Sequence, residues 1–228
     1  MCRLAQTLGR RIRTVVTPAE NALHQALAES AATSAFIASA LSAEAELSRS
    51  AKLAVVSLSI CLDHREATLL LAAHGARTSA FALMRPVFES CVRGCWFGFV
   101  ANDQQVALLF AGKLSTKLEA MARAVGRAEP ALRAIDSLTS MYKDRLDEFT
   151  HGTGAQLARW YGATEVTPRH SAGEVIDVLR FVDSIGLIAC AAREKLCGRS
   201  IDPFTSRLAQ AASPNRKLIA PAPPTTAA

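Results

Sequence analysis

The chain has 228 residues and a net charge of +6; half of its residues are hydrophobic and a fifth are charged. This balance is typical of a single globular domain with ample material for a core, and no apolar run reaches the ~18 uninterrupted residues that a membrane span needs. Alanine is common and no stretch alternates polar and apolar residues at the strand period. The composition therefore argues against a sheet and predicts an all-α fold.

The positive charge is concentrated at the two ends of the chain. Residues 1–16 contain four arginines and no acid, and residues 199–228 have a surplus of three positive charges, which leaves −1 for the rest. A nucleic-acid-binding domain usually carries its positive charge on the folded part, so the basic composition is weak evidence for such a partner. We predict a basic arm over 1–16, a helical bundle over 17–199 and a flexible tail rich in Pro, Ala and Thr over 200–228.

The bundle is expected to contain about five to seven helices. Thr17, Pro18 and Glu20 have the spacing of a capping box with proline at the first helical position, so the first helix begins there and extends to about residue 47, with or without a break near Thr33. A second helix is predicted over 50–74, where Gly75 ends it.

The third helix, predicted over 79–100, has the clearest apolar stripe. Its members recur at spacings of three and four residues: Phe81, Met84, Phe88, Cys91, Cys95 and Phe99. Pro86 lies inside this pattern and either kinks the helix or begins a new segment.

Shorter elements follow in the second half of the chain. We predict helices over 103–112 and 115–125, a longer one from Pro130 to Thr150, and a short segment over 156–161. Ser171 and Glu174 form a second capping box, which begins a last long helix that ends near residue 196.

None of the six cysteines belongs to a CxxC pair. Cys91 and Cys95 share one helix face, but a zinc site needs several ligands in tetrahedral geometry. We interpret the cysteines as core thiols and predict no metal and no cofactor. No secretory signal precedes the bundle, so a reducing, cytoplasmic location is expected.

Arg85, Glu89 and Arg93 occupy successive turns beside the apolar stripe of the third helix. Charges at this spacing are neighbours on a helix surface. Such a ladder can orient an anionic ligand, or it can hold one helix against the next. With Trp96, one turn further on, it is a candidate lining for an interhelical pocket or interface.

Arg145 and His151 form a second candidate pair, at the end of the helix predicted to reach Thr150. Metal-free RNA cleavage needs a cation near the scissile phosphate and a base near the 2′-hydroxyl, and these residue types supply both. On an ideal helix the two side chains are roughly 120° apart, so they converge only if the helix unwinds near Thr150. His151 can equally cap the helix C-terminus.

This pair resembles the R-x(4–6)-H motif of HEPN-domain proteins, helical bundles that include many endoribonucleases of toxin and phage-defence systems. The resemblance implies that Arg145 binds phosphate, that His151 is the acid/base, and that two copies dimerise.

A longer resemblance covers most of residues 50–197. The run Arg85-Pro-Val-Phe-Glu-Ser-Cys-Val-Arg-Gly-Cys-Trp96, the later His151-Gly152 turn and Arg159 are similar to a family of uncharacterised bacterial helical proteins with an R-P-x-x-E-x-x-x-R-G-x-W helix. This resemblance implies a single helical domain of bacterial, cytosolic origin and no particular reaction.

Arg159 is followed by Trp160 and Tyr161, directly after the predicted turn. An arginine with aromatic neighbours can stack on bases, cover a partner surface, or fix a loop to the bundle.

The sequence leaves two hypotheses for the function. The first is a non-catalytic interaction or ligand-binding module, with a second copy or another protein as partner, in which Arg85, Glu89, Arg93, Trp96 and Arg159 bind. The second is a HEPN-like, metal-independent endoribonuclease that acts on RNA through Arg145 and His151. Neither requires a membrane, and whether the chain is an enzyme stays open.

Overall fold

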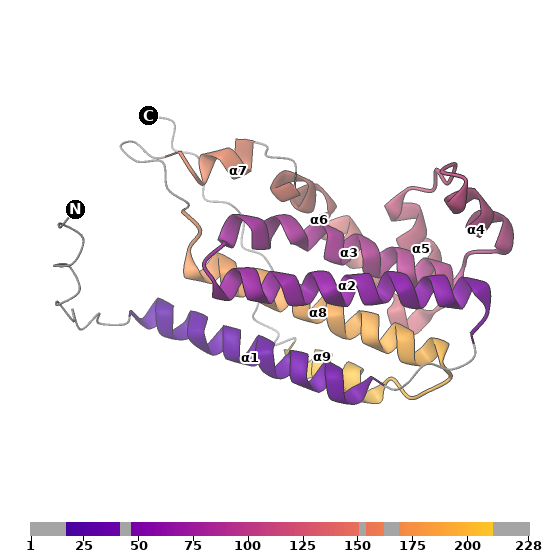
Figure 1. The fold of residues 1–228 in the computed structure, drawn as a ribbon, viewed down its shortest axis with the longest axis horizontal. Coiled ribbons are helices and arrows are strands. Elements are labelled where there is room, and N and C mark those ends of the chain that lie inside the picture. The colour runs from indigo at the N-terminus through magenta and orange to yellow at the C-terminus, as the bar shows by residue number, and fades with distance from the viewer. Residues whose placement is uncertain (1–16, 42–46, 151–153, 162–168, 212–228) are drawn as a thin grey trace, which may run out of the picture.

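The computed structural model describes residues 17–41, 47–150, 154–161 and 169–211, which form nine α-helices, one short 3-10 helix and no β-strand (Figure 1). The predicted all-α fold is confirmed. In chain order the elements are α1 (Pro18–Ala40), α2 (Arg49–Ala73), α3 (Arg77–Phe99), α4 (Asp103–Phe110), α5 (Leu118–Ala128), η1 (Pro130–Leu132), α6 (Ala134–Thr150), α7 (Gly154–Ala158), α8 (Ala172–Leu196) and α9 (Asp202–Ala211).

Capping boxes begin both α1 and α8, as their sequences predict. In α1 the hydroxyl of Thr17 accepts from the backbone N–H of Glu20 at 3.2 Å, and the Glu20 carboxylate accepts from the N–H of Thr17 at 2.7 Å. Ser171 and Glu174 repeat this arrangement in α8. Each box satisfies N–H groups that have no partner within the helix.

Two predictions left open along the first and third helices are now decided. α1 runs through Thr33 without a break and ends at Ala40, earlier than predicted. The Thr33 hydroxyl donates to the carbonyl of Glu29 at 3.0 Å, which satisfies it within the helix. α3 is one helix that contains Pro86, so the proline does not begin a separate segment.

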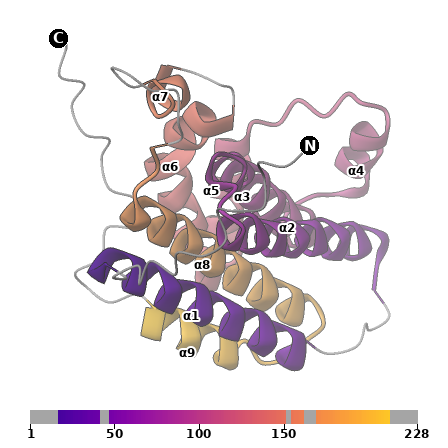
Figure 2. The ribbon, with the colours of Figure 1, turned by 60° about the vertical axis from the view of Figure 1, so that its left-hand side comes forward.

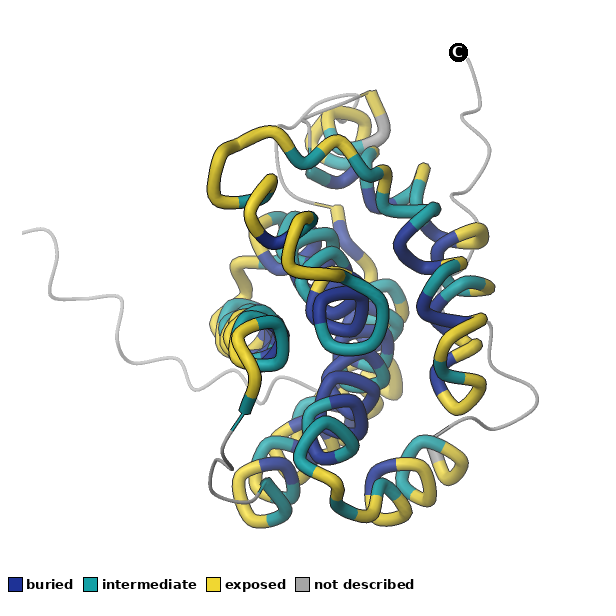
Figure 3. Tube along the Cα trace, turned by 90° about the vertical axis from the view of Figure 1, so that its right-hand side faces the viewer, coloured by how far each residue is buried: buried dark blue, intermediate teal, exposed yellow. Residues whose placement is uncertain are grey.

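α8 lies at the centre of the bundle. It contacts α1, α2, α3 and α9, and the views in Figures 1 and 2 place it between α1 on one side and α2 and α3 on the other. Its buried side chains point in every direction around the helix axis, as expected for a helix surrounded by others. Figure 3 shows the buried positions gathered toward the middle of the molecule. None of the described helices combines the length and apolarity that crossing a membrane requires.

Two glycines of α3 allow its neighbours to approach closely. A Cβ built on Gly94 would lie 2.7 Å from Leu58 Cγ and 3.1 Å from the backbone nitrogen of Leu58, and one built on Gly98 would lie 2.8 Å from the side chain of Leu196. Real Cβ atoms essentially never come this close to another heavy atom, so a side chain at either position would clash with its neighbour. The absence of a side chain at these glycines therefore allows the helices to pack closely. The glycine that follows Arg93 is therefore explained by helix packing.

Arg65 of α2 joins three helices although its residue is only 1% exposed. Its Nε lies 2.9 Å from Oδ1 of Asp183 on α8, and its Nη2 donates to the Ser30 carbonyl of α1 at 2.7 Å. Its Nη1 donates to the hydroxyl of Ser34 on α1 and to Glu66 at 2.9 Å. Each of the three guanidinium nitrogens of Arg65 therefore donates to at least one acceptor. A charged group can be buried at an acceptable cost only when its N–H groups are hydrogen-bonded in this way.

Asp183 depends on this arrangement for its charge. Burial raises the pKa of its carboxyl group above the usual value, and the charge and hydrogen bonds of Arg65 and a hydrogen bond from Ser30 offset only part of this rise. The stem of Arg65 also packs beside Gly186, since a Cβ there would lie 3.5 Å from Cγ and Cδ of the arginine. The sequence shows Asp183 only as an interruption in an apolar helix.

Part of the segment 200–228, which was predicted to be a flexible tail, is helical. Residues Asp202–Ala211 form α9, which packs on α8. Phe204 is 1% exposed, and its ring centroid lies 5.5 Å from that of Phe36 on α1. The guanidinium of Arg207 lies 4.7 Å above the ring of Phe36. One buried aromatic side chain therefore extends the helical part beyond the predicted boundary; residues 1–16 and 212–228 lie outside the described part of the chain.

Arg65→Met should destabilise the protein by about 3–5 kcal/mol, because it leaves the Asp183 carboxyl group buried without its counter-ion. Urea unfolding followed by circular dichroism measures this change. Lys52→Met, at an exposed position of the same helix, is the matched control and should change the free energy of unfolding by less than about 0.5 kcal/mol.

The double variant Arg65→Met/Asp183→Asn separates the ion pair from general damage to the core. It should lose less stability than the sum of the two single variants, because neither buried charge remains unpaired. Additive losses would contradict a coupled role of the two residues.

Candidate functional site

Arg85, Glu89 and Arg93 lie on successive turns of α3 and pair through the glutamate. Glu89 Oε1 accepts from Arg85 Nε at 2.9 Å, and Glu89 Oε2 lies 3.4 Å from Arg93 Nη2. The side chains of Arg85 and Glu89 are mostly buried, and that of Arg93 is more exposed. One carboxylate thus neutralises part of the charge of both arginines.

Arg85 also extends this ladder to the next helix. Its Nη1 contacts Oδ1 of Asp147 on α6, which gives Arg85 a second carboxylate. Nearby, Lys143 of α6 pairs with Glu119 of α5 at 2.9 Å, and the hydrogen bond from this lysine lowers the pKa of Glu119. Charged pairs therefore connect α3 to α6 and α6 to α5.

Trp96 lies in the hydrophobic core. It is 2% exposed, and its ring meets that of Phe97 edge-on at a centroid distance of 5.3 Å. A side chain buried to this extent has no face available to a second molecule, so Trp96 and the ladder do not form one open surface.

Arg145 lies on α6 and is partly exposed, and the next residue, Leu146, is buried in the core. The positive charge of Arg145 opposes the rise in the pKa of Tyr142 that burial causes. His151 lies outside the described residues, so the predicted convergence of these two side chains stays a prediction. α6 ends at Thr150, directly before that histidine.

Arg159 follows α7 and joins it to two other elements. Its Nη2 lies 3.1 Å from Glu174 Oε1 at the start of α8, and its guanidinium carbon lies 4.8 Å from the ring centroid of Phe149 on α6. Its carbonyl accepts a hydrogen bond from the N–H of Arg169 at 2.7 Å. The arginine is largely buried and fixes the α7 segment to the bundle.

His170 is a residue of this region that the sequence did not single out. It is 3% exposed, and its ring centroid lies 4.4 Å from that of Phe81 on α3. Its Nε2 lies 3.3 Å from the hydroxyl of Thr78, and its carbonyl accepts from Arg77 Nη1 at 2.5 Å. Burial lowers the pKa of His170, which favours the neutral ring.

Within the described part of the chain, the position of His170 leaves one ring nitrogen without a partner and connects two helices. Its Nδ1 is buried without a hydrogen-bond partner among the described residues. The contacts also connect the start of α3 to the start of α8 across 92 residues of chain. No local spacing could have revealed this contact, because it exists only after the helices have packed.

Three large side chains in and directly after α7 are exposed, and we call them the α7 surface: Leu157 (63% exposed), Trp160 (37%) and Tyr161 (81%). The indole Nε1 of Trp160 donates to the Thr78 hydroxyl at 3.1 Å, which holds one edge of its ring in place. The α7 surface is therefore apolar and aromatic, and Trp160 and the neighbouring Arg159 attach its backbone firmly to the bundle.

Four cysteines lie together in the core, as predicted: Cys61 on α2, Cys91 and Cys95 on α3, and Cys190 on α8. A hydrogen bond with Cys91 and burial raise the pKa of Cys61 and of Cys95, and burial raises that of Cys190 to about 12. In the part of the chain that the structure describes, no group of three or more His, Cys, Asp or Glu residues is placed to hold a metal ion.

Comparison with known proteins identifies one family. A family model described as a family of unknown function, DUF6988, matches residues 58–202, which is more than half of the chain. The match begins within α2 and ends at the start of α9, so it includes the ladder, Arg145, Arg159 and His170. No curated protein and no solved structure matches the chain.

The buried neutral His170 should make stability depend on pH. Its folded-state pKa is lowered, so the unfolded chain binds the proton more readily and stability is lost as pH falls below about 6.5. His170→Gln removes this loss. The stability advantage of the wild type over His170→Gln should therefore shrink between about pH 7.5 and about pH 5 in urea unfolding experiments.

The control is His24→Gln at an exposed position of α1. Its difference from the wild type should stay nearly constant over the same pH range. An advantage of the wild type over His170→Gln that grows as pH falls would show that the buried ring is held as the cation.

Proposed function

We propose that this chain, which belongs to the DUF6988 family of unknown function, is a non-catalytic interaction module that binds a protein partner through its α7 surface. The observation that carries the proposal is the exposure of Leu157, Trp160 and Tyr161 on a segment that Arg159 holds against the bundle.

The composition of the α7 surface fits a protein partner. Tyrosine and tryptophan are enriched among the residues that contribute most to binding, and large apolar side chains are enriched at the centre of interfaces. Trp160 is already oriented by its bond to Thr78. A surface that is ordered before binding loses less conformational entropy on association.

The polar groups beneath the α7 surface support binding more than chemistry. Arg159 is paired with Glu174, the indole of Trp160 bonds to Thr78, and Arg77 donates to the carbonyl of His170. Each of these contacts joins two parts of the protein and therefore stabilises the fold. Arg85 and Arg93 likewise share Glu89, which fits a role in holding α3 against α6.

Site-specific photocrosslinking tests this proposal. Replacing Tyr161 by p-benzoylphenylalanine should give a specific crosslinked protein in cells, and Leu157→Ser in the same chain should reduce its yield severalfold, because truncating an anchor residue weakens binding by about 1–2 kcal/mol. Val56, an exposed apolar residue on α2, is the matched control position.

The identity of the crosslinked species then decides the partner. A product of twice the chain mass assigns a homodimer, and a different mass assigns another protein. Absence of any product from position 161, or the same products from positions 161 and 56, would contradict binding at the α7 surface.

The alternative is a HEPN-like, metal-independent endoribonuclease. One observation favours it: the described part of α6 reaches Thr150, directly before His151, so Arg145 lies within two turns of the histidine along the chain. Arg145 is partly exposed on the last turns of the same helix. In this mechanism Arg145 binds the scissile phosphate and His151 acts as the acid/base.

An RNA-cleavage assay in EDTA, together with a growth-toxicity assay, separates the two proposals. If the alternative holds, the wild type cleaves RNA, and Arg145→Ala and His151→Ala each reduce the rate by about 10²–10⁴-fold. Tyr161→Ala is the matched control and should leave cleavage intact. Our preferred proposal predicts no cleavage by any of these proteins.

A further inference from the structure

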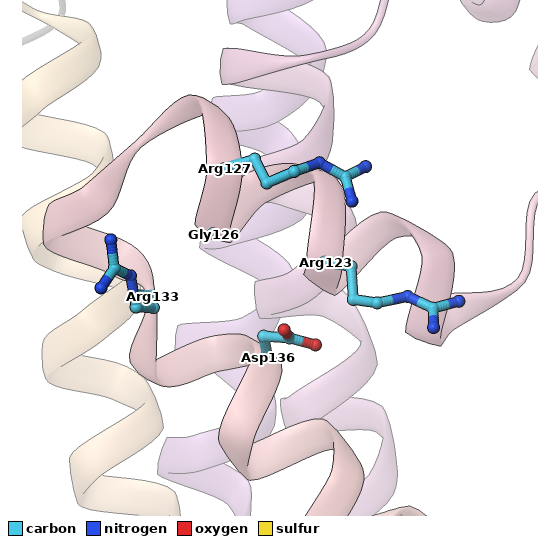
Figure 4. A pocket seen from close by; sticks show the side chains of 5 residues that line it. All are labelled: Arg123, Gly126, Arg127, Arg133 and Asp136. Atoms are coloured by element: carbon cyan, nitrogen blue, oxygen red, sulfur yellow. The ribbon is translucent and has the colours of Figure 1, made fainter.

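A cavity of about 390 Å³ that is open to solvent lies between α5 and the junction of η1 with α6, at the opposite end of α6 from α7. It is lined by Arg123, Gly126 and Arg127 from α5 and by Arg133 and Asp136. In Figure 4 the side chains of Arg123, Arg127 and Asp136 extend toward the same side, whereas that of Arg133 points away from them. Three guanidinium groups and one carboxylate leave the lining positively charged.

The arginines of this cavity differ from those of the core, the ladder and α7. Arg65, Arg85, Arg93 and Arg159 each pair with a carboxylate of the protein. Among the described residues, neither a carboxylate nor a hydrogen-bond acceptor lies within bonding distance of the guanidinium of Arg123, Arg127 or Arg133. The carboxylate of Asp136 lines the same cavity without forming an ion pair there.

The spacing of Arg123 and Arg127 makes this arrangement unfavourable without an anion. They are four residues apart on α5, so their like charges lie on one side of the helix, which is slightly unfavourable. Arg127 lies in the last turn of α5, where a cation also interacts favourably with the helix dipole. That effect applies to Arg127 alone and explains neither Arg123 nor Arg133.

The close approach of the two walls shapes the cavity. Gly126 is buried, and a Cβ at this position would lie 3.5 Å from Arg133 Cα and 3.7 Å from Asp136 Cβ. The α5 backbone therefore passes directly beside the η1–α6 junction, and the arginines project from this contact. The packed backbone on both sides fixes the points from which the charged side chains extend.

Arginine is suited to phosphate, because its planar guanidinium donates two parallel hydrogen bonds to phosphate oxygens. A carboxylate next to them suits a ligand that also carries hydroxyl groups, as when an acidic residue accepts from a ribose hydroxyl. The cavity volume falls within the range of about 300–1,000 Å³ that is typical of sites for small molecules.

We infer that this cavity binds a small phosphomonoester, with Arg123 and Arg127 on the phosphate and Asp136 accepting from a hydroxyl of the same ligand. Arg133, whose side chain points away from these three, adds only longer-range positive charge. This site goes beyond the interaction proposed for the α7 surface, shares no residue with it, and does not depend on it.

Calorimetric titration with ribose 5-phosphate, inorganic phosphate and ribose tests the inference on the full-length protein. Ribose 5-phosphate should bind most tightly, inorganic phosphate more weakly, and ribose not measurably. Arg123→Gln/Arg127→Gln should weaken binding of ribose 5-phosphate at least about tenfold, since each charged hydrogen bond contributes to affinity. Both side chains are exposed, so the variant should keep the fold, which circular dichroism checks.

Three further variants separate the parts of the site. Arg169→Gln, an exposed arginine outside the cavity, removes one positive charge and should leave binding unchanged. Arg123→Lys/Arg127→Lys keeps the charge but loses the paired hydrogen bonds, so binding should be intermediate. Asp136→Asn should weaken ribose 5-phosphate severalfold and leave inorganic phosphate the same or slightly tighter.

Two results would overturn the inference. Binding of ribose 5-phosphate that is equal in the wild type and the Arg123→Gln/Arg127→Gln variant excludes the cavity as the phosphate site. Equal affinity for ribose 5-phosphate and inorganic phosphate, unaffected by Asp136→Asn, excludes the hydroxyl contact. Neither result bears on crosslinking from position 161.

Discussion

The buried guanidinium of Arg65 is the constraint on which the rest of the structure depends. An unpaired charge in a core costs several kcal/mol, so the position of Arg65 requires acceptors from α1 and α8 to lie at hydrogen-bond distance at the same time. Ser30, Ser34 and Asp183 meet this requirement. Hydrophobic burial alone tolerates small rotations and shifts between helices, whereas these directional bonds specify how α1, α2 and α8 lie relative to one another.

Because α8 is fixed at the centre, the remaining helices and their charged side chains pack at defined positions. α3 packs against α2 through Gly94, and Arg85 then reaches Asp147 on α6. Several cations beside the core, among them Arg65, Arg85 and Lys143, pair with carboxylates of other helices and thereby join helices. Two features stand apart from this internal pairing: the exposed aromatic side chains of α7, and the arginines that line the cavity between α5 and α6. Our two proposals rest on these features because the internal packing does not account for them.

The predictions from sequence succeeded where the signal was local. The capping boxes at Thr17 and Ser171 identified the starts of α1 and α8, since a cap depends on residues three positions apart. Predictions failed where a distant contact decided the outcome. Phe204 looks like one residue in a polar tail, but a contact with Phe36 orders α9. Trp96 looks like an interface residue beside charged neighbours, but the helix rotation places it in the core.

The sequence by itself determined that the chain is all-α, where most helices lie, that Cys61, Cys91, Cys95 and Cys190 belong to the core, and which charges follow one another along α3. These properties depend on helical periodicity and on neighbours within one or two turns. Only the tertiary structure decided that Asp183 meets Arg65, that His170 stacks on Phe81, and that Arg123, Arg127, Arg133 and Asp136 surround one cavity. Most of these contacts join residues far apart in the chain, and all of them depend on how helices rotate and cross, which side-chain packing sets.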